Sequence, residues 1–110
     1  MLPLQSYKKR KVKLRTPDFL TDGDSIGIVS TARKVTDKEI NPCEYILESW
    51  GLKVVKGEHL FSTDNQYAGT DAQRTQDLQR MIDDPAIKAI LCARGGYGTT
   101  RILDKLDFAN

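Results

Sequence analysis

The feature that most restricts the fold is an apolar stretch that runs without a polar break into a glycine-rich turn, at residues 89–98. Parallel strands that are buried on both faces have such continuous apolar sequences. In open α/β sheets, ligands bind beyond the carboxyl ends of these strands, where the chain turns toward the next helix. The sequence therefore predicts an α/β protein with a ligand site at the turn that contains Gly95, Gly96 and Gly98.

Strand-like and helix-like segments alternate along the rest of the chain. Their order implies right-handed crossovers and a small parallel sheet of strand order 2-1-3. Helices on both faces of this sheet would give a three-layer arrangement of the flavodoxin or Rossmann type. The strands are expected at residues 25–30, 52–56 and 86–93, and the helices at residues 37–50, 71–83 and 99–106.

Local signals support the first two helices. Thr36 with Glu39, and Thr70 with Gln73, have the spacing of a capping box at a helix start. Pro42 lacks an amide donor, so the first helix either kinks there or restarts with Asn41 as its cap.

The predicted domain, residues 17–110, is expected to be incomplete. The strand at residues 86–93 is apolar enough to be central, yet a sheet of three strands leaves it at an edge. The chain also ends where the alternation calls for another strand. An unpaired apolar edge tends to associate with another strand, so a homo-oligomer is expected.

The charge of the chain is unevenly distributed. The formal net charge is +2, but outside residues 1–16 the acidic residues outnumber the basic ones. This predicts a basic N-terminal extension on an acidic body, with neither a nucleic acid nor a membrane as partner. No segment is long and apolar enough for a membrane span or a secretory signal, which favours a cytoplasmic protein. The basic residues of the extension are Lys8, Lys9, Arg10, Lys11, Lys13 and Arg15.

The cysteines and the histidine do not indicate a metal site or a cofactor. Cys43 and Cys92 are far apart and His59 is the only histidine, so the spacing is not that of a metal site. We therefore expect reduced structural thiols, and a solvent-exposed or loop-packing role for His59 in the long connection at residues 57–69.

The glycine turn has the chemistry of an anion receptor. Gly95 and Gly96 permit positive φ, so backbone amides can converge on an oxygen atom. The sequence lacks the Gly-Lys-Ser/Thr of a P-loop, and its glycine spacing differs from the dinucleotide fingerprint. An oxyanion or carboxylate site and a purely structural turn both remain open at this point.

Four segments in register resemble the N-terminal domain of the LD-carboxypeptidase family, which includes muramoyltetrapeptide carboxypeptidases and microcin self-immunity peptidases. The resemblance covers residues 17–108. It is carried by Asp-Ser-Ile-Gly-Ile-Val-Ser at 24–30, Trp-Gly-Leu-Lys-Val at 50–54, Tyr-Ala-Gly-Thr-Asp at 67–71 with Arg74 and Asp77-Leu78, and Arg-Gly-Gly-Tyr-Gly at 94–98 with Arg-Ile-Leu at 101–103.

The resemblance implies a cytoplasmic serine peptidase that hydrolyses the L,D bond of a murein tetrapeptide and releases the terminal D-alanine during cell-wall recycling. The family uses a Ser-Glu-His triad, whose serine follows the next strand and whose other members belong to a second domain. No triad residue is therefore assigned in this chain, and a fragment of this extent is expected to be inactive alone.

The resemblance also suggests roles near the turn. It implies that Gly95 and Gly96 line the oxyanion hole. Ser30 and Thr31, after the first strand, would face the same crevice and bind substrate, or else cap a helix or turn.

Arg94 and Tyr97 are further candidates for substrate binding. Arg94 binds a substrate carboxylate or pairs with Asp104 or Asp107. Tyr97 lines the crevice or packs over the end of the sheet. Thr99 is expected to cap the last helix rather than to act as a nucleophile.

Two functions of other classes remain open alongside the peptidase. One is a small flavodoxin-like module that binds an anion or nucleotide at the turn. The other is a non-catalytic interaction module that uses its open sheet edge and basic extension.

Overall fold

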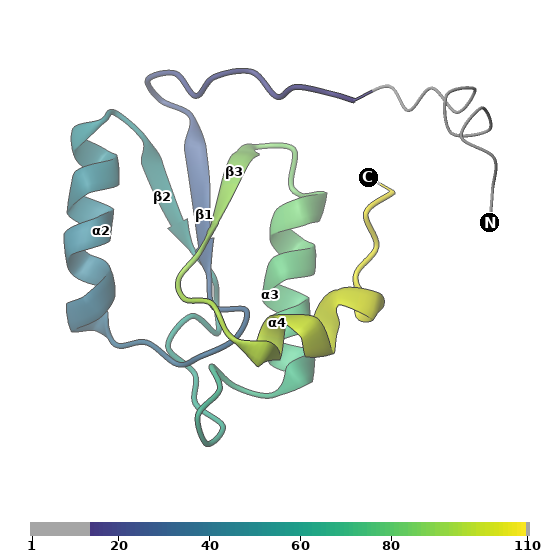
Figure 1. Cartoon of the computed structure of the whole chain (residues 1–110). Helices are drawn as coiled ribbons and strands as arrows, with labels where there is room; N and C mark the ends of the chain where they lie inside the picture. The colour runs from purple at the N-terminus through teal and green to yellow at the C-terminus, as the bar shows by residue number, and fades with distance from the viewer. Residues whose placement is uncertain (1–13, 110) are drawn as a thin grey trace, which may run out of the picture.

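A computed structural model of the chain describes residues 14–109 (Figure 1). Residues 1–13, most of the predicted basic extension, lie outside the described residues. The elements alternate as the sequence predicts, which confirms the α/β class. They are β1 (Ser25–Val29), α2 (Asp37–Ser49), β2 (Lys53–Lys56), α3 (Asp71–Asp83), β3 (Ile87–Cys92), α4 (Tyr97–Ile102) and the 3-10 turn η1 (Leu103–Lys105).

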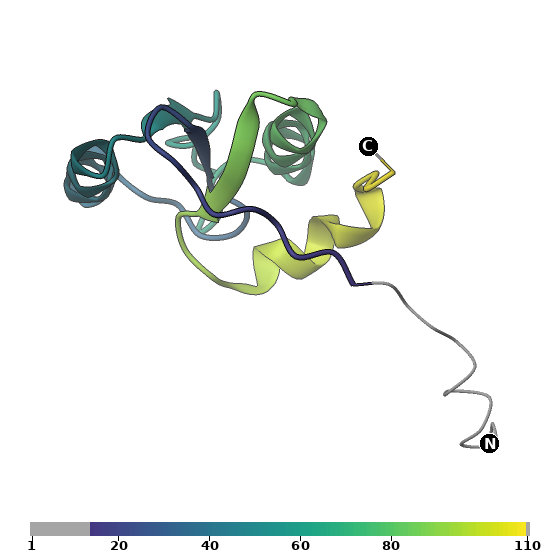
Figure 2. The same cartoon turned by 90° about the horizontal axis from the view of Figure 1, so that it is seen from above.

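The three strands form one parallel sheet in the order β2-β1-β3, which confirms the predicted topology. Figure 2 shows α2 on one face of this sheet and α3 on the other, while α4 follows β3 at the carboxyl end. The ladder between β1 and β3 pairs Gly27 with Ile90 and Val29 with Cys92. The carboxyl ends of β1 and β3 therefore lie side by side.

The main hydrophobic core lies between β1 and α2. Ile26 and Ile28 alternate along β1 and so point to the same face, where Ile40 and Leu47 of α2 cover them. Gly27 faces the other way, and a Cβ there would meet the sulfur of Met81 in α3 at 2.7 Å. The central strand β1 is therefore packed between α2 on one face of the sheet and α3 on the other.

Capping boxes begin α2 and α3 at the predicted residues. The amide of Thr36 donates to Glu39 Oε1 at 3.1 Å, and the amide of Thr70 donates to Gln73 Oε1 at 3.0 Å. The helix α2 runs without interruption through Pro42, so the restart at Asn41 is wrong. Pro42 removes only its own amide, and the carbonyl left free lies in the solvent-exposed first turn.

The last helix differs most from its prediction. It begins at Tyr97 instead of residue 99, because Gly96 is its N-cap, and it tightens into η1 from Leu103. The edge position of β3 leaves Leu91 37% exposed and Cys92 exposed. Among residues 14–109, no helix has the length and apolar character needed to cross a membrane.

Candidate functional site

The glycine turn links β3 to α4 at the carboxyl end of the sheet (Figure 1). The amide of Ala93 donates to the Val29 carbonyl at 2.9 Å and extends the ladder to the start of the turn. Gly96 has a φ of 148°, a conformation that side-chain-bearing residues rarely adopt. Gly96 thus uses the positive φ that glycine permits. Gly95 does not use it, and it is exposed, with open space where a Cβ would lie.

The first turn of α4 is pressed against the chain that follows β1. A Cβ on Gly98 would lie 2.7 Å from the Cα of Ala32 and 3.2 Å from the Thr31 carbonyl oxygen. The hydroxyls of Thr31 and Thr99 are hydrogen-bonded at 2.8 Å. The predicted capping role of Thr99 is therefore wrong, because its hydroxyl bonds to Thr31, in the segment after β1, and no side chain caps α4.

Ser30 and Thr31 directly follow β1, and Thr31 contacts the first turn of α4. Both residues are buried, and the Ser30 hydroxyl donates to the Leu60 carbonyl at 2.8 Å. Neither hydroxyl caps a helix, since each bonds to a distant segment instead. Their predicted contact with substrate stays a prediction.

Arg94 and Tyr97 lie at the rim of the turn. Arg94 Nη1 is 3.7 Å from Glu39 Oε2, so the predicted pairing with Asp104 or Asp107 is wrong. The route of β3 brings Arg94 to the start of α2 instead. Tyr97 is 87% exposed and does not pack over the end of the sheet.

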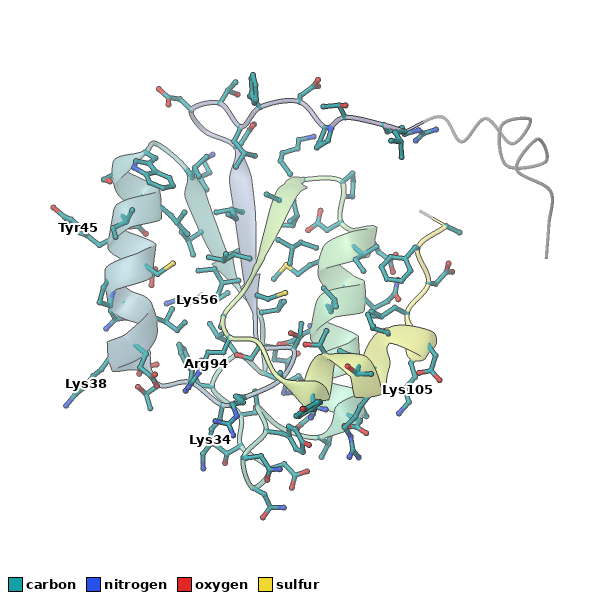
Figure 3. The ribbon with its side chains drawn as sticks, viewed as in Figure 1. Lys34, Lys38, Tyr45, Lys56, Arg94 and Lys105 are labelled. Atoms are coloured by element: carbon teal, nitrogen blue, oxygen red, sulfur yellow. The ribbon has the colours of Figure 1, made fainter. Side chains whose placement is uncertain are left out.

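Two positive side chains lie near this rim. Figure 3 shows Arg94 and Lys34 at the carboxyl end of the sheet, whereas Lys38 and Tyr45 project from the outer side of α2. Arg94 is paired with Glu39, and Lys34 adds a positive charge that favours an anionic ligand. Binding of substrate by Arg94 and Tyr97 stays a prediction.

Arg74 of α3 is a buried charged residue, and its one predicted significance was as part of the family resemblance. Its side chain has no exposed surface and pairs with Asp71. Arg74, Leu78 and Met81 have the spacing of one helix face. The position of an arginine on an otherwise apolar helix face was the sequence signal that could have predicted its burial.

Asp71 joins two arginines at the start of α3. Hydrogen bonding to Arg101 first, and then to Arg74, holds the pKa of the Asp71 carboxyl below its usual range. The same pairing raises the pKa of Arg101. The guanidinium groups of Arg74 and Arg101 also lie 4.8 Å and 5.5 Å from the ring centroid of Tyr67, within cation–π range.

Asp77 is a second buried charged residue on α3. Burial raises the pKa of its carboxyl, although the His59 amide donates to Oδ2 at 2.8 Å. Its other oxygen, Oδ1, has no hydrogen-bond partner within the described part of the chain. The ring of His59 bonds to Gln76 at 3.1 Å, which confirms the loop-packing role. Residues 14–109 contain no cluster of side chains suited to a metal ion.

These features define an open-sheet α/β protein with an exposed, anion-compatible glycine turn at the carboxyl ends of its strands. Residues 26–110 match the family model of the LD-carboxypeptidase N-terminal domain, and the chain belongs to this family.

Known relatives agree with this assignment. The chain is 38% identical over 93 residues to a probable murein peptide carboxypeptidase of Bacillus subtilis, covering 84% of this chain and 29% of that protein. It superposes on the crystal structure of an MccF-like protein from Bacillus anthracis with a TM-score of 0.76 and 30% identity, over 83% of this chain and 29% of the other. A muramoyltetrapeptide carboxypeptidase from Oxalobacter formigenes gives a TM-score of 0.69 at 29% identity, over 77% and 28% of the two chains. This chain therefore spans less than a third of the length of these relatives.

Proposed function

We propose that this chain forms the N-terminal part of a serine LD-carboxypeptidase that releases the terminal D-alanine from murein tetrapeptides. The observation that carries the proposal is the exposed turn with Gly96 at a φ of 148°, in a chain 38% identical to a probable murein peptide carboxypeptidase. The part of the relatives that this chain does not span would supply the nucleophile and its base.

The turn would supply half of an oxyanion hole. When a serine attacks the peptide carbonyl, negative charge develops on the carbonyl oxygen, and aligned backbone amides stabilise this charge. One such donor typically contributes about 2.7–4 kcal/mol in the transition state. Open space surrounds the Cβ position of Gly95, which leaves room for an oxygen atom to approach the turn from that side. At Gly96 a Cβ would meet Ala32 at 3.2 Å and Arg33 at 3.3 Å, so the absent side chain there lets the turn pack on the segment after β1.

The surrounding residues would bind the peptide. A murein tetrapeptide carries several carboxylates, and the half-exposed Arg94 side chain lies at the rim of the turn, where a substrate carboxylate would compete with Glu39 for it. Tyr97 is free to contact substrate because it is 87% exposed. Ser30 and Thr31 would support the floor of the same crevice. We also place the protein in the cytoplasm, where murein peptides are recycled.

The proposal is tested with a chimera. The chain is joined to the portion of the Bacillus subtilis relative that lies beyond the matched region, and release of D-alanine from a murein tetrapeptide is measured. We expect hydrolysis by the chimera and none by the 110-residue chain. A folded chimera that does not release D-alanine would refute the proposal.

Variants of the chimera localise the effect. Alanine does not readily adopt the φ of 148° at Gly96, so Gly96→Ala should turn this amide away from the oxyanion. We expect kcat to fall about 100-fold to 1,000-fold, the usual cost of losing one oxyanion donor. Tyr45→Ala serves as a control, because Tyr45 is 74% exposed and lies on α2 far from the turn. Binding of inorganic phosphate or a nucleotide at the turn, without hydrolysis, would favour the anion-binding module instead.

A further inference from the structure

Arg74 donates hydrogen bonds to several backbone carbonyls at once. Nε donates to the Thr31 carbonyl at 3.1 Å, and Nη1 donates to the Gly69 carbonyl at 2.7 Å. Nη2 donates to the Asp71 carboxylate and, at 3.4 Å, to the Gly98 carbonyl. All three guanidinium nitrogens are therefore engaged inside the protein.

These carbonyls belong to three segments that are separate in the sequence. Thr31 follows β1, Gly69 leads into α3, and Gly98 lies in the first turn of α4. The guanidinium group of Arg74 thus connects α3 both to the segment after β1 and to the first turn of α4. A lysine has one nitrogen with three donors and cannot reproduce this set of directions.

Two other contacts confine α4 at the same place. The Thr31 and Thr99 hydroxyls bond at 2.8 Å, and the absent side chain of Gly98 lets the helix approach the Ala32 backbone. The direction in which the Gly96 amide points therefore depends on how α4 is seated. Arg74 contributes the charged hydrogen bonds to the Thr31 and Gly98 carbonyls that help to fix the position of α4.

We propose that Arg74 is a positioning residue that sets the geometry of the oxyanion turn through the carbonyls of Thr31 and Gly98. This inference rests on the proposed role of the turn. Arg74 does not touch substrate, since its side chain has no exposed surface. It acts by fixing the backbone that carries Gly96.

The test uses amide spectra of the 110-residue protein. In Arg74→Lys, we expect the amide resonances of Gly96, Gly98 and Thr99 to shift, with β2 unchanged. Hydrogen exchange of the Thr99 amide, which donates to the Gly96 carbonyl at 3.4 Å, should accelerate at least about tenfold. Arg80→Lys is the matched control, because Arg80 lies on the same helix in an exposed ion pair with Glu58 and should leave the turn unaffected. Turn amides that keep their wild-type shifts in Arg74→Lys would overturn the proposal, as would an equal perturbation of the whole sheet.

The wild-type protein provides a readout that needs no substitution. The Arg74 Nε proton should exchange slowly with water and show a coupling across its hydrogen bond to the Thr31 carbonyl carbon. The exposed Arg80 Nε proton should exchange rapidly. An Arg74 proton that exchanges as fast as that of Arg80 would contradict the inference.

Chemical rescue separates positioning from general loss of stability. In Arg74→Ala, millimolar guanidinium should return the turn amides toward their wild-type shifts, and equal concentrations of ammonium should not. Failure of guanidinium to restore the turn in folded protein would count against the proposal.

The chimera distinguishes this inference from the proposed function. Arg74→Lys should lower kcat at least about tenfold with little change in KM, since the donor geometry matters most in the transition state. An inactive wild-type chimera with an Arg74-dependent turn would refute the proposed function alone. An active Arg74→Lys chimera with unchanged kcat would refute the positioning role alone.

Discussion

Replacing Gly98 with alanine would test how tightly α4 is seated on the segment after β1. The added Cβ would lie 2.7 Å from the Ala32 Cα, 3.1 Å from the Tyr67 ring and 3.2 Å from the Thr31 carbonyl oxygen. Two of these three neighbours are backbone atoms, which cannot turn aside as a flexible side chain does. The first turn of α4 would have to move away by about 1 Å to reach an ordinary contact distance.

The expected cost follows from two opposing effects. Forcing an extra methyl group into a packed contact costs about 1–3 kcal/mol. Alanine recovers up to about 1 kcal/mol, because glycine is a poor helix former. Because the obstacle is backbone, the packing cost should lie in the upper part of its range, at about 2–3 kcal/mol. After the gain of about 1 kcal/mol from alanine, the free energy of unfolding should fall by about 1–2 kcal/mol. For a domain of this size, that lowers Tm by roughly 4–16 °C.

Urea and thermal unfolding of two matched alanine variants provide the assay. Gly95→Ala is the control, because open space surrounds its Cβ position and its φ is not in the positive range. It should change the free energy of unfolding by less than about 0.5 kcal/mol. A Gly98→Ala protein as stable as Gly95→Ala would refute the close seating of α4 on β1.

Three further predictions concern the core, the pH dependence and the open edge. Ile102→Ala should cost about 2–5 kcal/mol in urea unfolding, because Ile102 is completely buried; a loss below 1 kcal/mol would contradict its burial. Burial raises the pKa of Asp77 above 3.8, so the folded protein binds this proton more tightly than the unfolded chain does. The free energy of unfolding should therefore decrease as the pH rises from 3.8 through the raised pKa, and Asp77→Asn should remove this slope in urea unfolding across that range; an unchanged slope would refute the assignment. The apolar edge of β3 should make the chain self-associate in sedimentation experiments, and Leu91→Lys should weaken that association; a wild-type protein that stays monomeric at high concentration would refute edge pairing.

The two edges of the sheet differ in a way that supports the last prediction. The strand β2 is short and has Lys53 and Lys56 at its ends, both exposed. The edge strand β3 is longer. Its one charged residue is the exposed Lys88 near its start, and Leu91 and Cys92 are exposed at its carboxyl end. Charged residues discourage pairing along a free edge, and their absence at Leu91 permits it.

Much of the fold was predictable because its signals are local. A capping box needs residues only three positions apart, and it placed the starts of α2 and α3 correctly. The alternation of elements predicted a parallel sheet with right-handed crossovers, and the expected helices on both faces go with the observed order β2-β1-β3. The end of the last helix was less predictable, because a 3-10 turn replaces its final residues.

The site was predictable only in outline. The glycine turn and its place at the carboxyl end of β3 follow from sequence order. The partner of Arg94 was wrong, because Asp104 and Asp107 are near in sequence while Glu39 is near in space. Arg74 was underestimated, since sequence spacing shows that it shares a face with apolar residues but does not show which carbonyls it meets.

The sequence alone therefore determined the elements, their order and the presence of a glycine turn, because hydrogen bonds and hydrophobic periodicity within a few residues specify them. The tertiary structure decided which glycine adopts a positive φ, as Gly96 does, and which one must lack a side chain to fit its neighbours, as Gly98 does. It also decided which charged side chains are buried. The bond between Thr31 and Thr99 joins residues 68 positions apart. Such contacts depend on the path of the whole chain, and they decide how the turn is held.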